Sequence, residues 1–316
     1  MKGYTSETIR NVALLGHGGC GKTTFLEAAL LETGVIKKLG KVESGNTVSD
    51  YDKMEIERGF SINTSVVPIE WKDSKINFID TPGYFDFVGE VNAALRASEA
   101  AVIMVDAGAG IQVGTEAAWK ACERYSTPRF IVITKRDKDE FDFYKTFEEL
   151  KGKFGDALIP LSWPLSAEID EDLKEAIASA DDELMEKYFE GEEFTDEEIR
   201  KGLVKGISEG AIVPVCSSAF ELGHGVEGLL DLLLTYVPTP LQHGPYKGFN
   251  NANEHVERLC LTDAPMSAFV FKTIVDPFVG KISIMKVVTG KMESGTEVFC
   301  QRTEERRVGK ECRSRW

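Results

Sequence analysis

Cysteine and histidine are scarce in this sequence, and neither is arranged as a metal or redox site. The six cysteines are scattered and form no CxxC pair, which is typical of free thiols in a reducing compartment and implies no disulfide framework. The four histidines have no mutual spacing that indicates a metal site or the base of a nucleophile. We therefore interpret the histidines as structural or surface residues.

Long apolar stretches are also missing. No apolar run approaches the roughly 20 residues that a helix needs to cross a bilayer. The first residues, MKGYTSETIRNVALLG, lack the apolar stretch and the small-residue cleavage site of a signal peptide. The sequence therefore predicts a cytoplasmic protein without a membrane partner.

Positive charge is in deficit, because 37 lysines and arginines face 52 acids and give a net charge of -15. Proteins that recognise nucleic-acid backbones need clustered lysines and arginines, so we expect no sequence-specific DNA partner. The deficit is concentrated in residues 168–200, which hold fifteen acids and three bases. Such a stretch is usually a solvated face, and the functional alternative is a docking surface for a basic partner.

Short apolar runs alternate with helical patterns in the first part of the chain. This alternation is typical of a parallel sheet that helices cover on both faces. The predicted fold class is α/β, a doubly wound, mainly parallel sheet that binds ligands at the carboxyl ends of its strands. We predict strands at residues 10–16, 75–80, 100–106 and 129–134, and helices at 22–33, 87–98 and 115–124.

The pattern changes after residue 137 to acidic helices, then one more buried strand, and finally alternating strands. The spacing of Thr195 and Glu198 predicts a capping box at one helix start. The segment 241–264, with prolines and glycines, is predicted to be a linker. We predict helices at residues 141–154, 170–189, 196–208 and 226–236, a strand at 211–216, the opening of a partial β-barrel at 265–301, and a non-native or frameshifted tail at 302–316.

The strongest motif is GHGGCGKTT, a full GxxxxGK(S/T) loop between a predicted strand and a predicted helix. Backbone N–H groups of such a loop turn toward phosphates, and the helix presents its positive end to the same anion. Lys22 is expected to reach the β and γ phosphates, and the Thr23 hydroxyl to bind Mg²⁺. The predicted phosphate-binding residues are Gly16, His17, Gly18, Gly19, Cys20, Gly21, Lys22, Thr23 and Thr24.

A second motif, DTPG, closes another apolar strand about sixty residues after the first. The Asp80 carboxylate at that strand end is expected to hold the Mg²⁺ shell, through water. Gly83 offers a backbone N–H that is able to swing toward a γ phosphate. Alone, the string DTPG would indicate only a turn, but its position after the phosphate loop favours a role in nucleotide binding.

Two further strings indicate a guanine site. In TKRD, Asp137 is able to accept two hydrogen bonds from the ring N–H and the exocyclic amine of guanine, which adenine does not supply in that arrangement. Lys135 is able to lay its aliphatic stem on the base. Ser218, Ala219 and Phe220 follow the last buried strand and are expected to bring backbone N–H groups to the guanine carbonyl.

Between the first two motifs lies ERGFSIN. This polar, glycine-containing loop is able to act as a nucleotide-sensitive switch, with the Ser61 hydroxyl as the second side-chain ligand of Mg²⁺. The alternative interpretation is a solvated loop that enters the strand at residues 64–71.

Taken in order, GHGGCGKTT, ERGFSIN, DTPGYFDF, TKRD and SSAF resemble the translational GTPases. The later segment APMSAFVFKTIVDPFVGKISIMKVVTGKMESGTEVF is similar to the opening of the second domain of elongation factor G. The resemblance covers about residues 8–300. It implies a GTP-binding domain at residues 1–240 with an acidic insert at about 138–210.

The resemblance implies a GTPase that binds GTP, GDP and Mg²⁺ and acts on the ribosome. If the acidic insert is a docking surface rather than a solvated face, the mobile stalk of the large ribosomal subunit is the partner that we expect for it. Peptide-chain release factors and tetracycline-resistance ribosomal protection proteins share the front-end motifs and stay as alternatives. In the implied mechanism Lys22, Gly83 and the residue after Gly83 carry catalysis.

The sequence departs from the family pattern at four positions. Gly19 replaces an acid that helps to hold a monovalent cation, Ser61 replaces the switch threonine, and Thr134 replaces an asparagine. Tyr84 stands where the family has the histidine that orients the attacking water. Tyr84 either positions that water or packs beside Phe85 and Phe87, so a regulatory GTP-binding protein with little hydrolysis is a further alternative.

Overall fold

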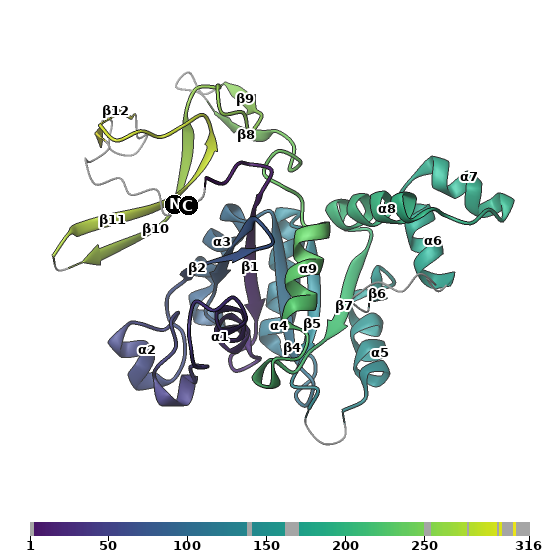
Figure 1. The fold of residues 1–316 in the computed structure, drawn as a ribbon, viewed down its shortest axis with the longest axis horizontal. Coiled ribbons are helices and arrows are strands. Elements are labelled where there is room, and N and C mark those ends of the chain that lie inside the picture. The colour runs from purple at the N-terminus through teal and green to yellow at the C-terminus, as the bar shows by residue number, and fades with distance from the viewer. Residues whose placement is uncertain are drawn as a thin grey trace. The chain divides into compact units, whose positions relative to one another are not determined.

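The structure is a computed structural model that describes residues 3–137, 141–161, 171–249, 254–276, 278–295, 297–298 and 306–307. The chain splits into two compact units, Met1–Thr239 and Pro240–Trp316 (Figure 1). Among the described helices, none combines the length and the hydrophobicity that a membrane crossing requires.

Within the described residues, the first unit is built on a seven-stranded sheet with the order β2-β3-β1-β4-β5-β7-β6. Strand β2 is antiparallel to β3, and the other neighbouring strands run parallel. The central strands are almost continuously buried, as expected when helices cover both faces. The strands are β1 (Ile9–Gly16), β2 (Ser65–Trp71), β3 (Ser74–Asp80), β4 (Ala100–Asp106), β5 (Arg129–Thr134), β6 (Leu158–Pro160) and β7 (Val213–Ser217).

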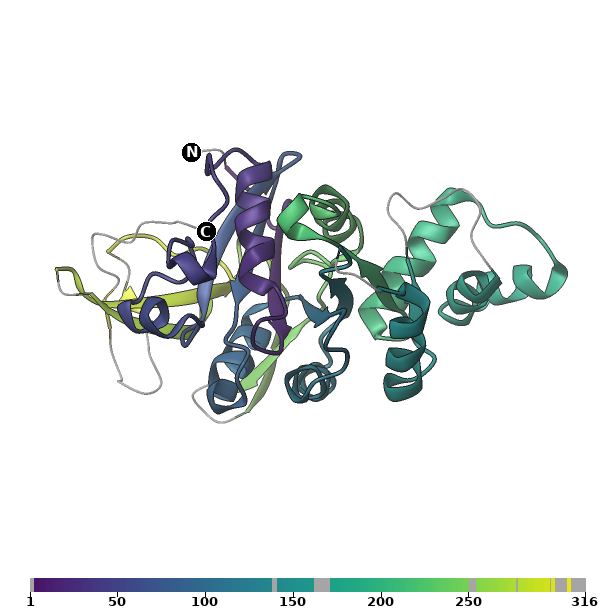
Figure 2. The same cartoon turned by 90° about the horizontal axis from the view of Figure 1, so that it is seen from below.

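Helices cover both faces of this sheet, so the predicted doubly wound α/β class is confirmed. Figure 2 shows α1 and α9 on one face and α3, α4 and α5 on the other. The helix α1 packs against α9, and α3 packs against α4. These helices are α1 (Lys22–Glu32), α3 (Val88–Ala97), α4 (Val113–Tyr125), α5 (Phe143–Phe154) and α9 (Val226–Tyr236).

Three acidic helices extend beyond the β6 edge of the sheet (Figure 1). They are α6 (Glu171–Ser179), α7 (Asp182–Glu190) and α8 (Asp196–Glu209). The single helix predicted at residues 170–189 is wrong, because the Asp181 carboxylate accepts a hydrogen bond from the Glu183 N–H and starts a new helix there. The capping box of Thr195 and Glu198 is confirmed at the start of α8.

The segment between α1 and β2 contains a short helix that the sequence interpretation missed, α2 (Lys53–Arg58). Its capping box pairs Asp52 with Glu55, and Gly59 ends it with a φ of 69°. Short 3-10 turns lie at η1 (Val42–Ser44), η2 (Phe85–Phe87) and η3 (Phe220–Leu222).

The second unit consists of antiparallel pairs, β8 (Tyr246–Phe249) with β9 (His255–Arg258), β10 (Ser267–Asp276) with β11 (Gly280–Thr289), and β12 (Glu297–Val298) with β13 (Arg306–Arg307). The pair β8–β9 lies within the segment predicted to be a linker. Apart from β13, the predicted tail at 302–316 lies outside the described residues.

Candidate nucleotide-binding site

The phosphate loop connects the end of β1 to the start of α1, at the carboxyl edge of the sheet. Gly21 precedes the helix with a φ of 98°, a left-handed conformation that favours glycine. The Lys22 ammonium group lies inside the loop, where it donates hydrogen bonds to the carbonyl oxygens of Gly16 at 3.0 Å and His17 at 2.9 Å. Lys22 is only 6% exposed. A cation is thus held at the centre of a ring of backbone groups.

Asp80, at the end of β3, meets the first turn of α1. The Thr23 hydroxyl donates a hydrogen bond to its Oδ2 atom at 3.2 Å. The carboxyl is 2% exposed, and its Oδ1 atom has no hydrogen-bond partner among the described residues. Burial raises the pKa of Asp80 to about 7, against the opposing effect of the Lys22 charge.

A buried carboxylate with one unpaired oxygen beside a threonine hydroxyl fits a hard cation, because Mg²⁺ binds oxygen ligands. Burial is the largest cause of the raised pKa of Asp80, and the nearby Asp50 charge adds to it. Thr23 and Asp80 would therefore hold Mg²⁺.

Ser61, predicted as the second side-chain ligand of Mg²⁺, is hydrogen-bonded elsewhere. Its hydroxyl donates to the Asp50 carboxylate at 2.7 Å. The nearby Glu55 carboxylate accepts hydrogen bonds from the backbone N–H groups of Ile62 at 2.9 Å and Asn63 at 2.8 Å. The three predicted metal ligands thus lie in two hydrogen-bonded sets. Like the Thr23 hydroxyl, the Ser61 hydroxyl donates its proton to a carboxylate and keeps its oxygen lone pairs for a metal ion.

The DTPG segment lies directly on the phosphate loop. A Cβ atom on Gly83 would lie 2.5 Å from the backbone nitrogen of Gly18, so only glycine allows this approach. Tyr84 follows, 41% exposed, with its ring edge-on to Phe60 at a centroid distance of 4.7 Å. The aromatic neighbours described for Tyr84 are therefore Phe60 and, at 6.3 Å, His17. The side chain of Phe85, one of the predicted neighbours, lies outside the description.

A pocket at the end of β5 brings three of the predicted motifs together. Asp137 lies at its exposed rim. Of the residues predicted for the guanine carbonyl, Phe220 lines the pocket, while Ser218 and Ala219 are buried behind it. The lining residues are Gly21, Thr24, Thr134, Lys135, Asp137, Phe220 and Glu221.

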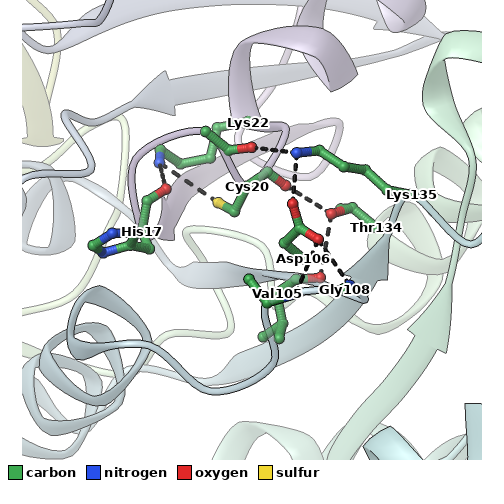
Figure 3. A network of polar contacts seen from close by, with 10 residues as sticks. His17, Cys20, Lys22, Val105, Asp106, Gly108, Thr134 and Lys135 are labelled. Atoms are coloured by element: carbon green, nitrogen blue, oxygen red, sulfur yellow. Dashed lines mark hydrogen bonds and ion pairs between the residues drawn. The ribbon is translucent and has the colours of Figure 1, made fainter. Parts of the chain in front are cut away.

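Two side chains of the β5 end join this pocket to the phosphate loop (Figure 3). The Thr134 hydroxyl, where the family has asparagine, donates to the Cys20 carbonyl oxygen at 2.7 Å. The Lys135 ammonium donates to the Gly19 carbonyl oxygen at 2.7 Å and forms an ion pair with Asp106.

Asp106 is the clearest functional residue that the sequence interpretation missed. It ends β4 directly beside Thr134 of β5 in the parallel register. Burial raises the pKa of Asp106, but the hydrogen bonds from Lys135 and from the Gly108 N–H outweigh it and bring the pKa below its usual value. Its position at the end of a buried strand was the signal that could have found it, as it found Asp80.

A phosphate loop, a buried carboxylate beside its threonine, and a base pocket with an aspartate at its rim all meet at one sheet edge. This fold and site define a P-loop nucleotide-binding domain of the GTPase type.

Comparison with known proteins identifies the family. The Elongation factor Tu GTP binding domain matches residues 7–239. Elongation factor G of Thermotoga maritima is 34% identical over 334 residues, which cover 93% of this chain and 48% of that protein, and elongation factor G of Thermotoga neapolitana gives the same values. A crystal structure of a protein from Thermus thermophilus matches with a TM-score of 0.80 and 33% identity, over 96% of this chain and 48% of that one.

The chain belongs to the Elongation factor Tu GTP binding domain family. The resemblance to translational GTPases of the elongation factor G type is confirmed. The chain spans about half the length of the curated relatives it matches, since 48% of each is covered.

Proposed function

We propose that this chain binds GTP and GDP with Mg²⁺ and hydrolyses GTP as the front part of a translation factor that acts on the ribosome, similar to elongation factor G. The meeting of Lys22, Asp80 and Asp137 at one sheet edge carries the proposal. A cytoplasmic location is part of it, because translation factors work where ribosomes are.

In this proposal each group has one task. Lys22 and the loop amides bind the phosphates, and Asp137 selects guanine while Lys135 lies against the base. Bound Mg²⁺ would neutralise phosphate charge, held by Thr23, by Asp80 through water, and by Ser61. The Gly83 N–H is close enough to the loop to contact a terminal phosphate, because its backbone touches Gly18.

Tyr84 is the residue on which the hydrolysis rate depends. A phenol is able to orient a water molecule by hydrogen bonding, but it lacks the positive charge with which a protonated imidazole stabilises developing negative charge. Hydrolysis is therefore expected to be slow while GTP binding stays tight. This feature also motivates the second candidate function, a regulator that binds GTP and scarcely hydrolyses it.

Tyr84→Phe removes the hydroxyl and keeps the ring. If Tyr84 positions water, single-turnover GTP hydrolysis with ribosomes is expected to slow at least about tenfold, with GTP affinity unchanged. Tyr144→Phe, at an exposed tyrosine on α5, is the matched control and is expected to have no effect. Tyr84→His provides the comparison with the family residue.

An unchanged rate in Tyr84→Phe would contradict water positioning and leave a packing role for the ring. Ribosomes that fail to stimulate phosphate release from the unsubstituted chain would instead favour the regulator. The first result is measured on Tyr84→Phe and the second on the unsubstituted chain, so the two outcomes are distinguishable.

The acidic helices α6–α8 are the part of the proposal that concerns a docking partner. Their lysines form ion pairs within the insert, among them Lys187 with Glu198 and Lys205 with Asp181. Exposed acids such as Glu183 and Glu186 therefore dominate the surface charge. We propose that this surface docks a basic partner, the mobile stalk of the large ribosomal subunit.

Reversing two of these charges tests the docking surface. Glu183→Lys with Glu186→Lys is expected to weaken stalk binding by about 3- to 30-fold, and the loss should shrink as salt is raised, because exposed charges are screened. Glu148→Lys, at an exposed acid on α5, is the control. Equal binding by both proteins in a titration with isolated stalk would contradict the docking role.

A further inference from the structure

Gly18 differs from the neighbouring glycines of the phosphate loop because its backbone conformation does not require glycine. Gly16, Gly19 and Gly21 have φ angles of 135°, 75° and 98°, which side-chain-bearing residues rarely adopt. The φ of Gly18 lies outside that left-handed range. Its backbone conformation would therefore accept another residue, so the absence of a side chain needs a different explanation.

The space that a side chain at position 18 would need is filled by the Tyr84 ring. A Cβ atom on Gly18 would lie 3.0 Å from Cζ, 3.1 Å from Cε2 and 3.4 Å from the hydroxyl oxygen of Tyr84. Carbon atoms in favourable contact are about 3.5–4.0 Å apart. A side chain at position 18 would therefore require the tyrosine ring to move by a few tenths of an ångström.

The ring is supported from another direction by Phe60. The two rings meet edge to face, with a centroid distance of 4.7 Å and an interplanar angle of 61°. Phe60 follows Gly59, the residue that ends α2, and Glu55 of that helix accepts hydrogen bonds from the N–H groups of Ile62 and Asn63. The backbone just before Tyr84 is fixed as well, because Gly83 touches Gly18.

We propose that Gly18 and Phe60 form a seat for the Tyr84 ring, and that Gly18 is a positioning residue that sets where the phenol hydroxyl lies at the phosphate loop. Tyr84 replaces the histidine of the family, and Gly18, which has no side chain, would leave the space that the tyrosine ring needs. The two positions would then act together. The part that concerns hydrolysis rests on the proposed function, whereas the seat itself does not.

The seat is tested without nucleotide by labelling the chain with 3-fluorotyrosine and recording its ¹⁹F spectrum. The Tyr84 resonance is identified by its loss in Tyr84→Phe. Gly18→Ala and Phe60→Leu are both expected to shift this resonance, because each changes a surface that touches the ring. Gly152→Ala is the control, since a Cβ there meets nothing within 4 Å. A Tyr84 resonance that both variants leave in place would overturn the proposal.

A double-mutant cycle tests the positioning role. Gly18→Ala is expected to slow single-turnover GTP hydrolysis at least about threefold more in the unsubstituted chain than in the Tyr84→Phe background, where no hydroxyl remains to be misplaced. Equal losses in both backgrounds would overturn the positioning role, because Gly18 would then act independently of the hydroxyl.

The two readouts separate this inference from the proposed function. If the chain neither binds nor hydrolyses GTP, the proposed function fails, while the ¹⁹F spectra still decide whether Gly18 and Phe60 seat the ring. If hydrolysis proceeds and the Tyr84 resonance shifts in neither variant, the proposed seat of Gly18 and Phe60 is contradicted and the proposed function stands.

Discussion

Lys22→Ala is expected to weaken GTP and GDP binding by about 10²–10⁴-fold, because charge-assisted hydrogen bonds contribute roughly 1.5–3 kcal/mol each and the ammonium would make more than one to the phosphates. Lys22 is the buried cation of the phosphate loop, with hydrogen bonds to two loop carbonyls. Titration with a fluorescent guanine nucleotide measures the loss.

Lys120→Ala is a suitable control, since Lys120 is an exposed lysine on α4. A thermal melt of Lys22→Ala confirms that the loop mutation leaves the fold intact. If Lys22→Ala bound nucleotide as tightly as the control, the phosphate site would have to lie elsewhere on the chain.

Asp137→Asn is expected to reverse base selectivity. In the proposed site the carboxylate would accept hydrogen bonds from the N–H groups of guanine, and two such bonds would give a preference of about 10²–10⁴-fold over adenine. An asparagine amide can donate where the carboxylate accepted, which suits the carbonyl of xanthine. Competition of GTP, XTP and ATP for the site measures the change, with Asp156→Asn at an exposed turn as the control.

Equal competition by ATP and GTP in the unsubstituted chain would contradict the guanine assignment. The pocket itself would then have to admit either base, although Asp137 lies at its rim.

The parts of the fold and site that the sequence predicts are those encoded by neighbouring residues. An apolar run that ends in a glycine loop predicts β1, and the loop glycines and Lys22 follow from the same stretch. The Thr195 cap was readable for the same reason, since its partner Glu198 is three residues away.

The missed features depend on segments that meet only in the folded chain. The pair of Lys135 with Asp106 requires β4 and β5 to lie side by side, which no local pattern states. The contact of Ser61 with Asp50 depends on α2, a helix too short to give a clear periodic signal. The split between α6 and α7 was missed because Asp181 stands in a run of acids that conceals its capping role.

Lys135 has a consequence for how the two ends of a nucleotide are recognised. Its backbone holds a left-handed φ of 60°, which costs a non-glycine residue about 1–3 kcal/mol, and its ammonium bridges the Gly19 carbonyl and Asp106. One side chain therefore lines the base pocket and also braces the phosphate loop. A shift of the loop by about 1 Å would stretch that 2.7 Å hydrogen bond beyond useful length. Lys135 and Thr134 both connect the base pocket to the phosphate loop, so we expect a shift at one end of the site to disturb contacts at the other.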